Sequence, residues 1–231
     1  LKKFYRMLEV ILDTETTGLS IKQNHRIVEI GCIEINDHMP TNNIFHTYVN
    51  PKRSVSDDAL KIHGYSEKFL SGKKTFEQIS EVFLNFIKNK KLVIHNAPFD
   101  LSFLNYELKL CKKDEIKSKD VIDTLELARA KFPGSQNSLD ALCKRFKVDN
   151  GKREKHNALL DCKLLLEVYI NLVDQKEPKL NFERGESITS QIKNDLSKAL
   201  NYSKKIVKLT DEEIQEHKLF LQSYLKKNFF K

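Results

Sequence analysis

The sequence contains no long apolar run, and its opening does not resemble a secretion signal. No window approaches the roughly 18 consecutive apolar residues that a membrane-spanning helix needs. The basic opening, LKKFYR, lacks the apolar stretch and the small-residue cleavage site of a signal peptide. Met7 is a candidate for the natural start, which leaves open whether residues 1–6 are native. We therefore expect a protein that does not associate with a membrane.

Cysteine is scarce. The four cysteines lie far apart within apolar patterns, and no two of them form a C-x-x-C pair; they are Cys32, Cys111, Cys143 and Cys162. This distribution predicts buried, reduced thiols rather than a disulfide framework. Together with the missing signal peptide, it indicates a reducing compartment, the cytoplasm.

Internal repeats and low-complexity tracts are also absent. The chain has 231 residues, of which 40% are apolar, enough for one sizeable core with an appendage. Its net charge of +8 fits a polyanionic partner, and it fits a lysine-rich surface without such a partner equally well. Composition does not separate these two interpretations.

Residues 7–174 alternate between strand and helix patterns, as an α/β domain requires. Short polar loops join the first three apolar segments, so we expect an antiparallel meander. The expected strands are 7–12, 26–35, 44–50 and 92–95. Helical patterns cover 75–87, the segment that starts at Asn96 and Pro98, 120–132, 137–146 and 155–173. The helix at 75–87 opens with Thr75 and Gln78 in capping-box spacing, and Asn96 is a candidate cap.

The remaining residues differ in composition. The polar, aperiodic stretch 175–208 predicts a flexible linker. In 209–231, Thr210 and Glu213 have capping-box spacing and precede an amphipathic helical pattern. We expect a domain at 7–174, a linker and a C-terminal segment.

Four carboxylates lie where apolar side chains are expected. Asp13 and Glu15 follow the apolar strand in VILDTETTGL and share one face, because residues two apart on a strand point the same way. Asp100 projects along the apolar stripe of its helix, and Asp161 lies at the edge of another stripe. A single inward Asp is most often a satisfied cap or ion pair. Four hard oxygen ligands from three segments indicate instead a Mg²⁺ or Mn²⁺ site.

His156 lies five residues before Asp161. A histidine near a helix start is usually a surface or capping residue. Beside a metal site, a histidine can act as a base that takes a proton from water. The combined chemistry is hydrolysis of a phosphodiester by two ions roughly 3.5 to 4 Å apart.

With these residues in view, the chain resembles the DEDDh family of 3′–5′ exonucleases, and within it the epsilon proofreading subunits of bacterial DNA polymerase III. The matching motifs are ILDTETTGL, LVIHNAPFD and EKHNALLDCKLLLEVY, with NSLDALCKRFKVDN before the last. They follow the family's order over residues 8 to about 173. A D-x-E alone occurs by chance in many chains, whereas the ordered set ending in H-x4-D is specific.

The resemblance implies a ribonuclease H-like fold, with a central mixed sheet flanked by helices. It also implies two divalent ions, Mg²⁺ or Mn²⁺. Asp13 would bridge both ions, Glu15 and Asp161 would hold the water-activating ion, and Asp100 would support the second. His156 would be the general base. The reaction would release nucleoside 5′-monophosphates from single-stranded or mispaired DNA 3′ ends, in the bacterial cytoplasm.

Five further positions match those at which the family contacts the terminal nucleotides. They are Thr16, Leu19, His63, Asn96 and Phe99. For Leu19 the alternatives are a packed loop residue and a wedge against the terminal bases. For His63 the alternatives are a helix-end cap and a substrate contact.

The resemblance extends to partners. EPKLNF resembles a sliding-clamp peptide, with Leu180 and Phe182 at the expected spacing, but Glu177 stands where such peptides normally carry Gln, so a plain linker is the alternative. Residues 209–230 resemble the region that binds the DNA polymerase III catalytic subunit. The expected contact residues are Ile214, Phe220 and Leu221. The alternative is a helix packed against its own domain.

Two other functions remain open. A 3′–5′ exoribonuclease would use the same metal site, because preference for the 2′-OH resides in the surrounding pocket. A non-catalytic polymerase accessory module would have kept the fold and lost the chemistry. All five catalytic positions are present in this sequence, which disfavours the second alternative.

Overall fold

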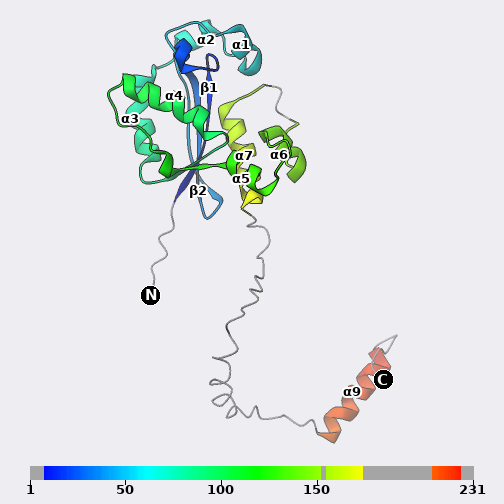
Figure 1. Ribbon diagram of the computed structural model, residues 1–231. Coiled ribbons are helices and arrows are strands. Elements are labelled where there is room, and N and C mark those ends of the chain that lie inside the picture. Colours follow the sequence, from blue (N-terminus) through cyan, green and yellow to red (C-terminus); the bar gives the residue numbers. More distant parts are fainter. Residues whose placement is uncertain (1–7, 152–154, 174–209, 225–231) are drawn as a thin grey trace, which may run out of the picture. The chain divides into compact units, whose positions relative to one another are not determined.

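The structure is a computed structural model that describes residues 8–151, 155–173 and 210–224. Five strands form one mixed sheet in the order β3-β2-β1-β4-β5 (Figure 1). The strands are β1 (Glu9–Thr16), β2 (Ile27–Asn36), β3 (Met39–Tyr48), β4 (Lys91–Ile94) and β5 (Val121–Asp123). The first three are antiparallel, β4 runs parallel to β1, and β5 runs parallel to β4. Strand β1 therefore lies at the centre of the sheet.

Helices cover both faces of the sheet. Figure 1 shows α3 and α4 on one side, and α5, α6 and α7 on the other. Their bounds are α1 (Asp57–His63), α2 (Glu67–Ser71), α3 (Phe76–Ile87), α4 (Ala97–Leu110), α5 (Thr124–Lys131), α6 (Leu139–Phe146) and α7 (Ala158–Leu172). Two short 3-10 turns, η1 (Ile21–Gln23) and η2 (Ser118–Asp120), lie in the connections. This arrangement confirms the expected α/β, ribonuclease H-like architecture.

Alternate residues of β1 enter different cores. Val10 and Leu12 are buried with Phe83 of α3 and Leu104 of α4. Ile11 faces the other way and is buried with Cys162 and Leu165 of α7. Because side chains alternate along a strand, Asp13 and Glu15 share the face of Ile11 and point toward α7. The three fully buried residues before Asp13 fix that end of β1 within the core.

Several expected elements are confirmed. The meander exists, and Thr75 N donates a hydrogen bond to Gln78 Oε1 at 2.9 Å at the start of α3. Strand β1 is longer than expected, so that Asp13 and Glu15 lie within the strand rather than after it. The four cysteines form no disulfide, and Cys32, Cys143 and Cys162 are buried as expected, whereas Cys111 is only half-buried. No helix in the described part of the chain is long and apolar enough to cross a membrane.

Two expectations about local structure are wrong. Residues 120–132 do not form one helix, because Val121–Asp123 pair with β4 as strand β5 and the helix begins only at Thr124. Asn96 occupies the cap position of α4 in a left-handed conformation, but its side chain makes no capping bond. Asp123 supplies the cap instead, accepting hydrogen bonds from Asn96 N at 3.1 Å and Ala97 N at 3.2 Å.

Helix α2 was not expected from the sequence, and α1 was expected only in the alternative that makes His63 a helix-end residue. They have seven and five residues, too short for an apolar period to show. Local capping defines them. The Ser56 and Ser66 side chains accept hydrogen bonds from Ala59 N and Phe69 N, and Gly64, with φ +80°, ends α1.

The C-terminal unit contains one described helix, α9 (Asp211–Tyr224). Thr210 and Glu213 form the expected capping box, with Thr210 N donating to Glu213 Oε2 at 2.9 Å and Glu213 N donating to Thr210 Oγ1 at 3.3 Å. The predicted linker at 175–208 lies outside the described residues. The domain boundaries therefore stay a prediction.

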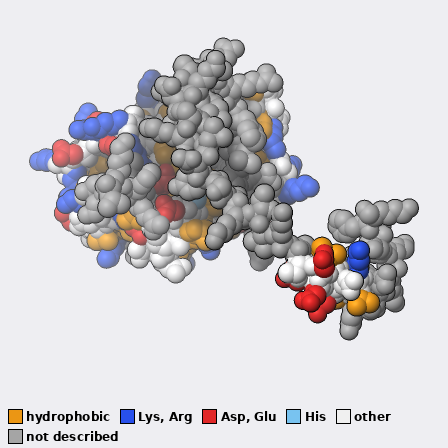
Figure 2. Space-filling view, turned by 90° about the horizontal axis from the view of Figure 1, so that it is seen from below, with side chains coloured by type: hydrophobic (Ala, Val, Ile, Leu, Met, Phe, Trp, Pro, Cys, Tyr) orange, Lys and Arg blue, Asp and Glu red, His pale blue; other side chains and the backbone are white. Residues whose placement is uncertain are grey.

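Basic side chains are spread over the surface. On the face that Figure 2 shows, Lys and Arg side chains lie at separate places with Asp and Glu side chains between some of them. The Lys and Arg side chains that are visible in that view form no single uninterrupted patch. The net charge of +8 therefore does not by itself mark a binding surface there.

Candidate active site

Two of the predicted carboxylates lie on β1 where the strand approaches its end. Asp13 lies opposite Gly31 of β2, and Glu15 lies opposite Glu29. The register shifts between Glu15 and Thr16, an irregularity that often re-aims side chains beside active sites. Glu15 is 9% exposed, so one carboxylate of the pair sits at the margin of the core.

Asp100 reaches the same region from the first turn of α4. It is only 3% exposed, and Thr14 Oγ1 donates a hydrogen bond to its Oδ1 at 2.6 Å. Burial raises the pKa of the Asp100 carboxyl to about 7, and the Thr14 hydrogen bond opposes that rise. The carboxyl therefore exchanges its proton near neutral pH, where a bound cation would favour the charged form.

The start of α7 supplies the other two residues. Asn157 caps the helix by accepting a hydrogen bond from Leu160 N at 3.0 Å, and Asp161 N donates to Asn157 O at 2.9 Å. Asp161 thus occupies the first turn, where the helix dipole favours a negative charge. His156 comes just before the cap, and its backbone N donates to Ile62 O at 3.1 Å.

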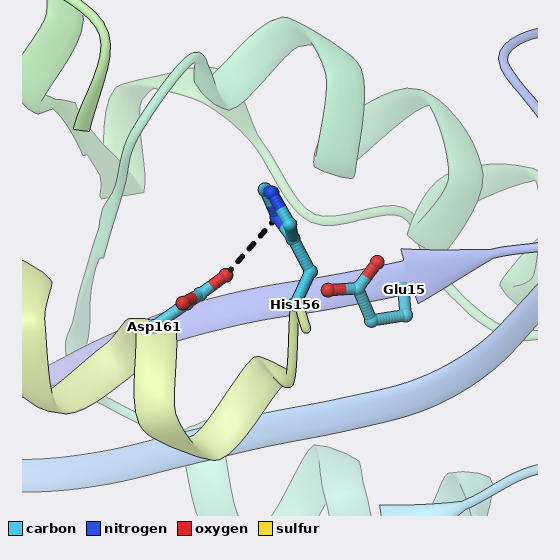
Figure 3. A group of neighbouring side chains, drawn as sticks. All are labelled: Glu15, His156 and Asp161. Atoms are coloured by element: carbon cyan, nitrogen blue, oxygen red, sulfur yellow. Dashed lines mark ion pairs between the residues drawn. The ribbon is translucent and has the colours of Figure 1, made fainter. Parts of the chain in front are cut away.

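Glu15, His156 and Asp161 converge on one point. One ligand atom of each lies within 4.8 Å of the others, and Figure 3 shows them meeting from β1 and the start of α7. His156 Nδ1 lies 3.5 Å from Asp161 Oδ2. The Asp161 side chain is buried, whereas 47% of the His156 side chain is exposed. Water can therefore reach the imidazole while the carboxylate stays fixed.

Among the described residues, the group of side chains that lie within 4.8 Å of one another contains neither Asp13 nor Asp100. Burial raises the pKa of the Cys162 thiol, and the charges of Asp13, Asp161 and Asp100 raise it further. The negative charges of these three carboxylates therefore act on one buried thiol of α7. The structure brings the predicted carboxylates of β1, α4 and α7 to one end of the sheet, which their separate positions in the sequence did not guarantee.

A cavity of about 310 Å³ opens beside Glu15. Its lining includes Glu15 and four of the five residues predicted to contact substrate, namely Thr16, Leu19, His63 and Phe99. Asn96 is exposed and lies instead on a different cavity, with His95 and Arg129. The structure thus places four of these positions together and separates the fifth.

Leu19 projects from a tightly built loop. It is 81% exposed, so it is not a packed loop residue. Thr16 Oγ1 donates to Gly18 O at 2.7 Å, and a Cβ at Gly18 would lie 2.3 Å from the His25 ring. The buried His25 ring and the glycine therefore fix the loop that carries Leu19.

His63 matches the helix-end alternative. It is the last residue of α1 and is buried, and its Nδ1 accepts a hydrogen bond from Tyr65 N at 3.0 Å. Its Nε2 then carries the hydrogen that faces Thr16 O at 3.3 Å. Burial lowers the pKa of His63, which favours this neutral form. Both ring nitrogens are committed to backbone atoms, although the residue lines the cavity.

The predicted partner residues are only partly described. On α9, Ile214 and Phe220 are exposed. The side chain of Leu221, and the whole of Leu180 and Phe182, lie outside the described residues.

Sequence reasoning also missed residues that support the site: Thr14, His25, Glu29 and Asp123. Their only sequence signal is a polar residue beside a motif or in an apolar strand, which many surface positions share.

Comparisons with known proteins show which family the chain is similar to. A family model described as exonuclease matches residues 10–169. The chain is 49% identical over 226 residues to the DNA polymerase III subunit epsilon of Rickettsia felis, covering 94% of this chain and 97% of the relative. It is 39% identical over 228 residues to that of Escherichia coli (strain K12), covering 95% and 94%. The nuclease domain of 3′hExo, a DEDDh family member solved bound to rAMP, has a TM-score of 0.64 at 20% identity, covering 74% and 94%, a likeness in fold.

Proposed function

Because the chain belongs to the exonuclease family and to the DNA polymerase III epsilon subunits within it, we propose that it is the 3′–5′ proofreading exonuclease of a bacterial replicative DNA polymerase. It removes nucleotides from single-stranded or mispaired DNA 3′ ends. The observation that carries this proposal is the meeting of Glu15, His156 and Asp161 within 4.8 Å, at the edge of a cavity.

The carboxylates fit a divalent-metal site. Four buried or half-buried Asp and Glu side chains at one end of a sheet are the hard oxygen ligands that Mg²⁺ and Mn²⁺ prefer. Asp13, Glu15, Asp100 and Asp161 would hold two such ions. When bound, the ions supply positive charge that activates water and stabilises the leaving oxygen.

His156 is the proposed general base. Its half-exposed ring is open to water, and Asp161 Oδ2 at 3.5 Å favours a proton on Nδ1. Nε2 is then left with the lone pair that accepts the proton of the attacking water. The backbone bond to Ile62 O and the Asn157 cap fix the backbone that carries the imidazole.

The cavity of about 310 Å³ is the proposed site of the 3′-terminal nucleotide. Phe99 and the exposed Leu19 offer apolar contacts to a base, which tolerate any sequence. Thr16 and His63 present backbone-anchored polar groups beside them. We assign Asn96 a contact outside this cavity, with the strand that precedes the terminal nucleotide.

We also propose two partners in the bacterial cytoplasm. The exposed Ile214 and Phe220 of α9, together with Leu221, would dock in a groove of the DNA polymerase III catalytic subunit. Leu180 and Phe182 would contact the sliding clamp. The names of the relatives support association with a DNA polymerase III, and the amphipathic sequence supports the tail as its site.

Digestion of matched DNA and RNA oligomers tests the substrate class. The two oligomers share one sequence and one 5′ label, and each is incubated with Mg²⁺ or Mn²⁺. The proposal predicts stepwise shortening of DNA from the 3′ end, faster than that of RNA. Faster shortening of RNA would identify an exoribonuclease instead. No hydrolysis of either oligomer would leave a non-catalytic module.

A further inference from the structure

Glu29 is the most deeply buried carboxylate beside the proposed site. It lies on β2 directly opposite Glu15, so both side chains point toward α7. Glu29 is 0% exposed, and like charges placed opposite each other are destabilising unless other groups compensate. Its surroundings therefore determine what this carboxylate does.

Four donors saturate the Glu29 carboxylate. Oε1 accepts from Asn157 Nδ2 at 2.7 Å and lies 2.7 Å from His46 Nε2. Oε2 accepts from Tyr65 Oη at 2.8 Å and from Ala158 N at 3.0 Å. With both oxygens occupied by protein donors, Glu29 is not available as a fifth metal ligand.

Two of these donors belong to the start of α7. Asn157 is the cap of the helix, and Ala158 N is one of the first amides, which have no partner inside a helix. Tyr65 connects a third segment, because its hydroxyl also accepts from Asn157 Nδ2 at 2.9 Å. Burial raises the pKa of the Tyr65 phenol, which keeps the hydroxyl a donor to Glu29.

Gly31, two residues further along β2, also lies against the start of α7. A Cβ there would lie 2.6 Å from the carbonyl carbon of Ala158 and 2.7 Å from Leu159 N. The first turn of α7 therefore rests directly on the backbone of β2. Glu29 and Gly31 share one strand face and together fix where α7 begins.

We propose that Glu29 is a positioning residue for His156. His156 directly precedes Asn157, so the carboxylate that holds Asn157 and Ala158 N also sets the place of the imidazole relative to Glu15 and Asp161. This inference rests on the proposed function, because it assigns Glu29 a part in the same reaction. Loss of contacts that orient the side chains around a metal site typically costs about 10- to 100-fold in activity, and we expect a loss of the same order here.

A double-mutant cycle tests whether Glu29 acts through His156. The full chain is compared with Glu29→Gln, His156→Ala and the double variant, by kcat and KM for a single-stranded DNA oligomer. Glu29→Gln is expected to lower kcat about 10- to 100-fold with KM little changed. In the His156→Ala background the same substitution is expected to change kcat by less than about 2-fold. Equal losses in both backgrounds would overturn the inference.

Glu34→Gln is the matched control. Glu34 is also a buried carboxylate of β2, but it is bound by Lys90, Thr41 and Asn43 away from the site. Its loss is expected to lower the melting temperature and leave kcat unchanged. An equal loss of kcat in Glu34→Gln would show that general destabilisation explains both variants, and would overturn the inference.

A measurement without metal or substrate gives an independent readout. Hydrogen exchange at the amides of Ala158 and Leu160 is expected to lose protection in Glu29→Gln and to keep it in Glu34→Gln. Unchanged protection in Glu29→Gln would contradict the inference. If Glu29→Gln does not fold, Tyr65→Phe removes only the hydroxyl shared by Glu29 and Asn157 and enters the same cycle.

The failures of the two proposals are distinguishable. A wild-type chain that hydrolyses neither DNA nor RNA would overturn the proposed function and this inference together. An active wild-type chain with independent losses from Glu29→Gln and His156→Ala would overturn this inference alone.

Discussion

Glu15 of β1 and Glu29 of β2 face each other across the central ladder, and their environments differ completely. Glu29 is saturated by four protein donors, whereas Glu15 meets His156 and Asp161 within 4.8 Å. Glu29 fixes the start of α7. Glu15 faces Asp161 in the first turn of α7 and His156 just before that helix. Two residues of the same type, side by side on one sheet face, therefore have separate tasks.

Neutralising Asp161 tests the proposed metal ligands. Asp161→Asn keeps the size of the side chain and removes its charge at the buried first turn of α7. We expect a loss of about 10²- to 10³-fold in the rate of DNA hydrolysis, because ion-derived stabilisation amounts to several kcal/mol. Initial rates on a single-stranded oligomer measure this.

Asp114→Asn is the control for Asp161→Asn, because Asp114 is exposed in the loop after α4. It is expected to hydrolyse DNA at the wild-type rate. An Asp161→Asn variant as active as this control would remove Asp161 from the ligand set.

Asp100 makes the stability of the metal-free protein depend on pH in a specific way. Burial raises its pKa from 3.8 in the unfolded chain to about 7 in the folded protein. Between these values the folded state binds more protons than the unfolded state, so this group's contribution to stability is lost as pH rises toward 7. Asp100→Asn removes the titration. Melting temperatures in chelator between pH 4 and pH 8 are expected to fall more steeply in the wild type than in Asp100→Asn.

Added Mn²⁺ provides the second half of that test. If Asp100 supports an ion, Mn²⁺ raises the wild-type melting temperature most at pH 8, where the carboxylate is charged. Parallel pH curves for the wild type and Asp100→Asn in chelator would contradict the raised pKa.

Leu19→Ala tests the exposed wedge at the cavity. The side chain is 81% exposed, so its truncation is expected to leave the melting temperature unchanged. If a terminal base packs against it, kcat/KM for single-stranded DNA falls roughly tenfold, the value of about 1.4 kcal/mol of apolar contact. Met39→Ala, at an exposed position on the edge strand β3, is the control. Equal kcat/KM in both variants would exclude Leu19 from the substrate site.

The tail is expected to bind the polymerase and to be dispensable for hydrolysis. Ile214→Asp with Phe220→Asp places charges on the exposed apolar positions of α9. Co-elution with the polymerase catalytic subunit is expected to be lost, while hydrolysis of a short oligomer stays at the wild-type rate. Lys218→Ala, an exposed polar position of the same helix, is the control. Retained co-elution in the double variant would show that these positions of α9 do not bind the polymerase catalytic subunit.

Much of the fold and of the site followed from local pattern. Alternation along β1 predicted that Asp13 and Glu15 share a face, and helical periodicity predicted that Asp100 points inward. The structure adds the contacts between distant segments. Thr14 and Asp100 are 86 residues apart, and Glu29 and Ala158 are 129 residues apart. No local period encodes such pairs, so the Glu29 network could not be found from one sequence.

The two wrong expectations about local structure also arose from contacts between distant segments. The three residues of β5 carried too little pattern to separate them from the helix that follows, and only their pairing with β4 makes them a strand. Asp123 then caps α4 from that strand, which displaced Asn96 from the predicted role. Tertiary contacts decided both cases.

The most direct test of the central claim is product release from a 3′-labelled single-stranded DNA oligomer, with and without divalent ions, by the wild type and by Asp13→Asn. The account predicts labelled nucleoside 5′-monophosphate from the wild type only when Mg²⁺ or Mn²⁺ is present, and none from a folded Asp13→Asn variant. Undiminished release by Asp13→Asn, or release by the wild type in chelator, would contradict it.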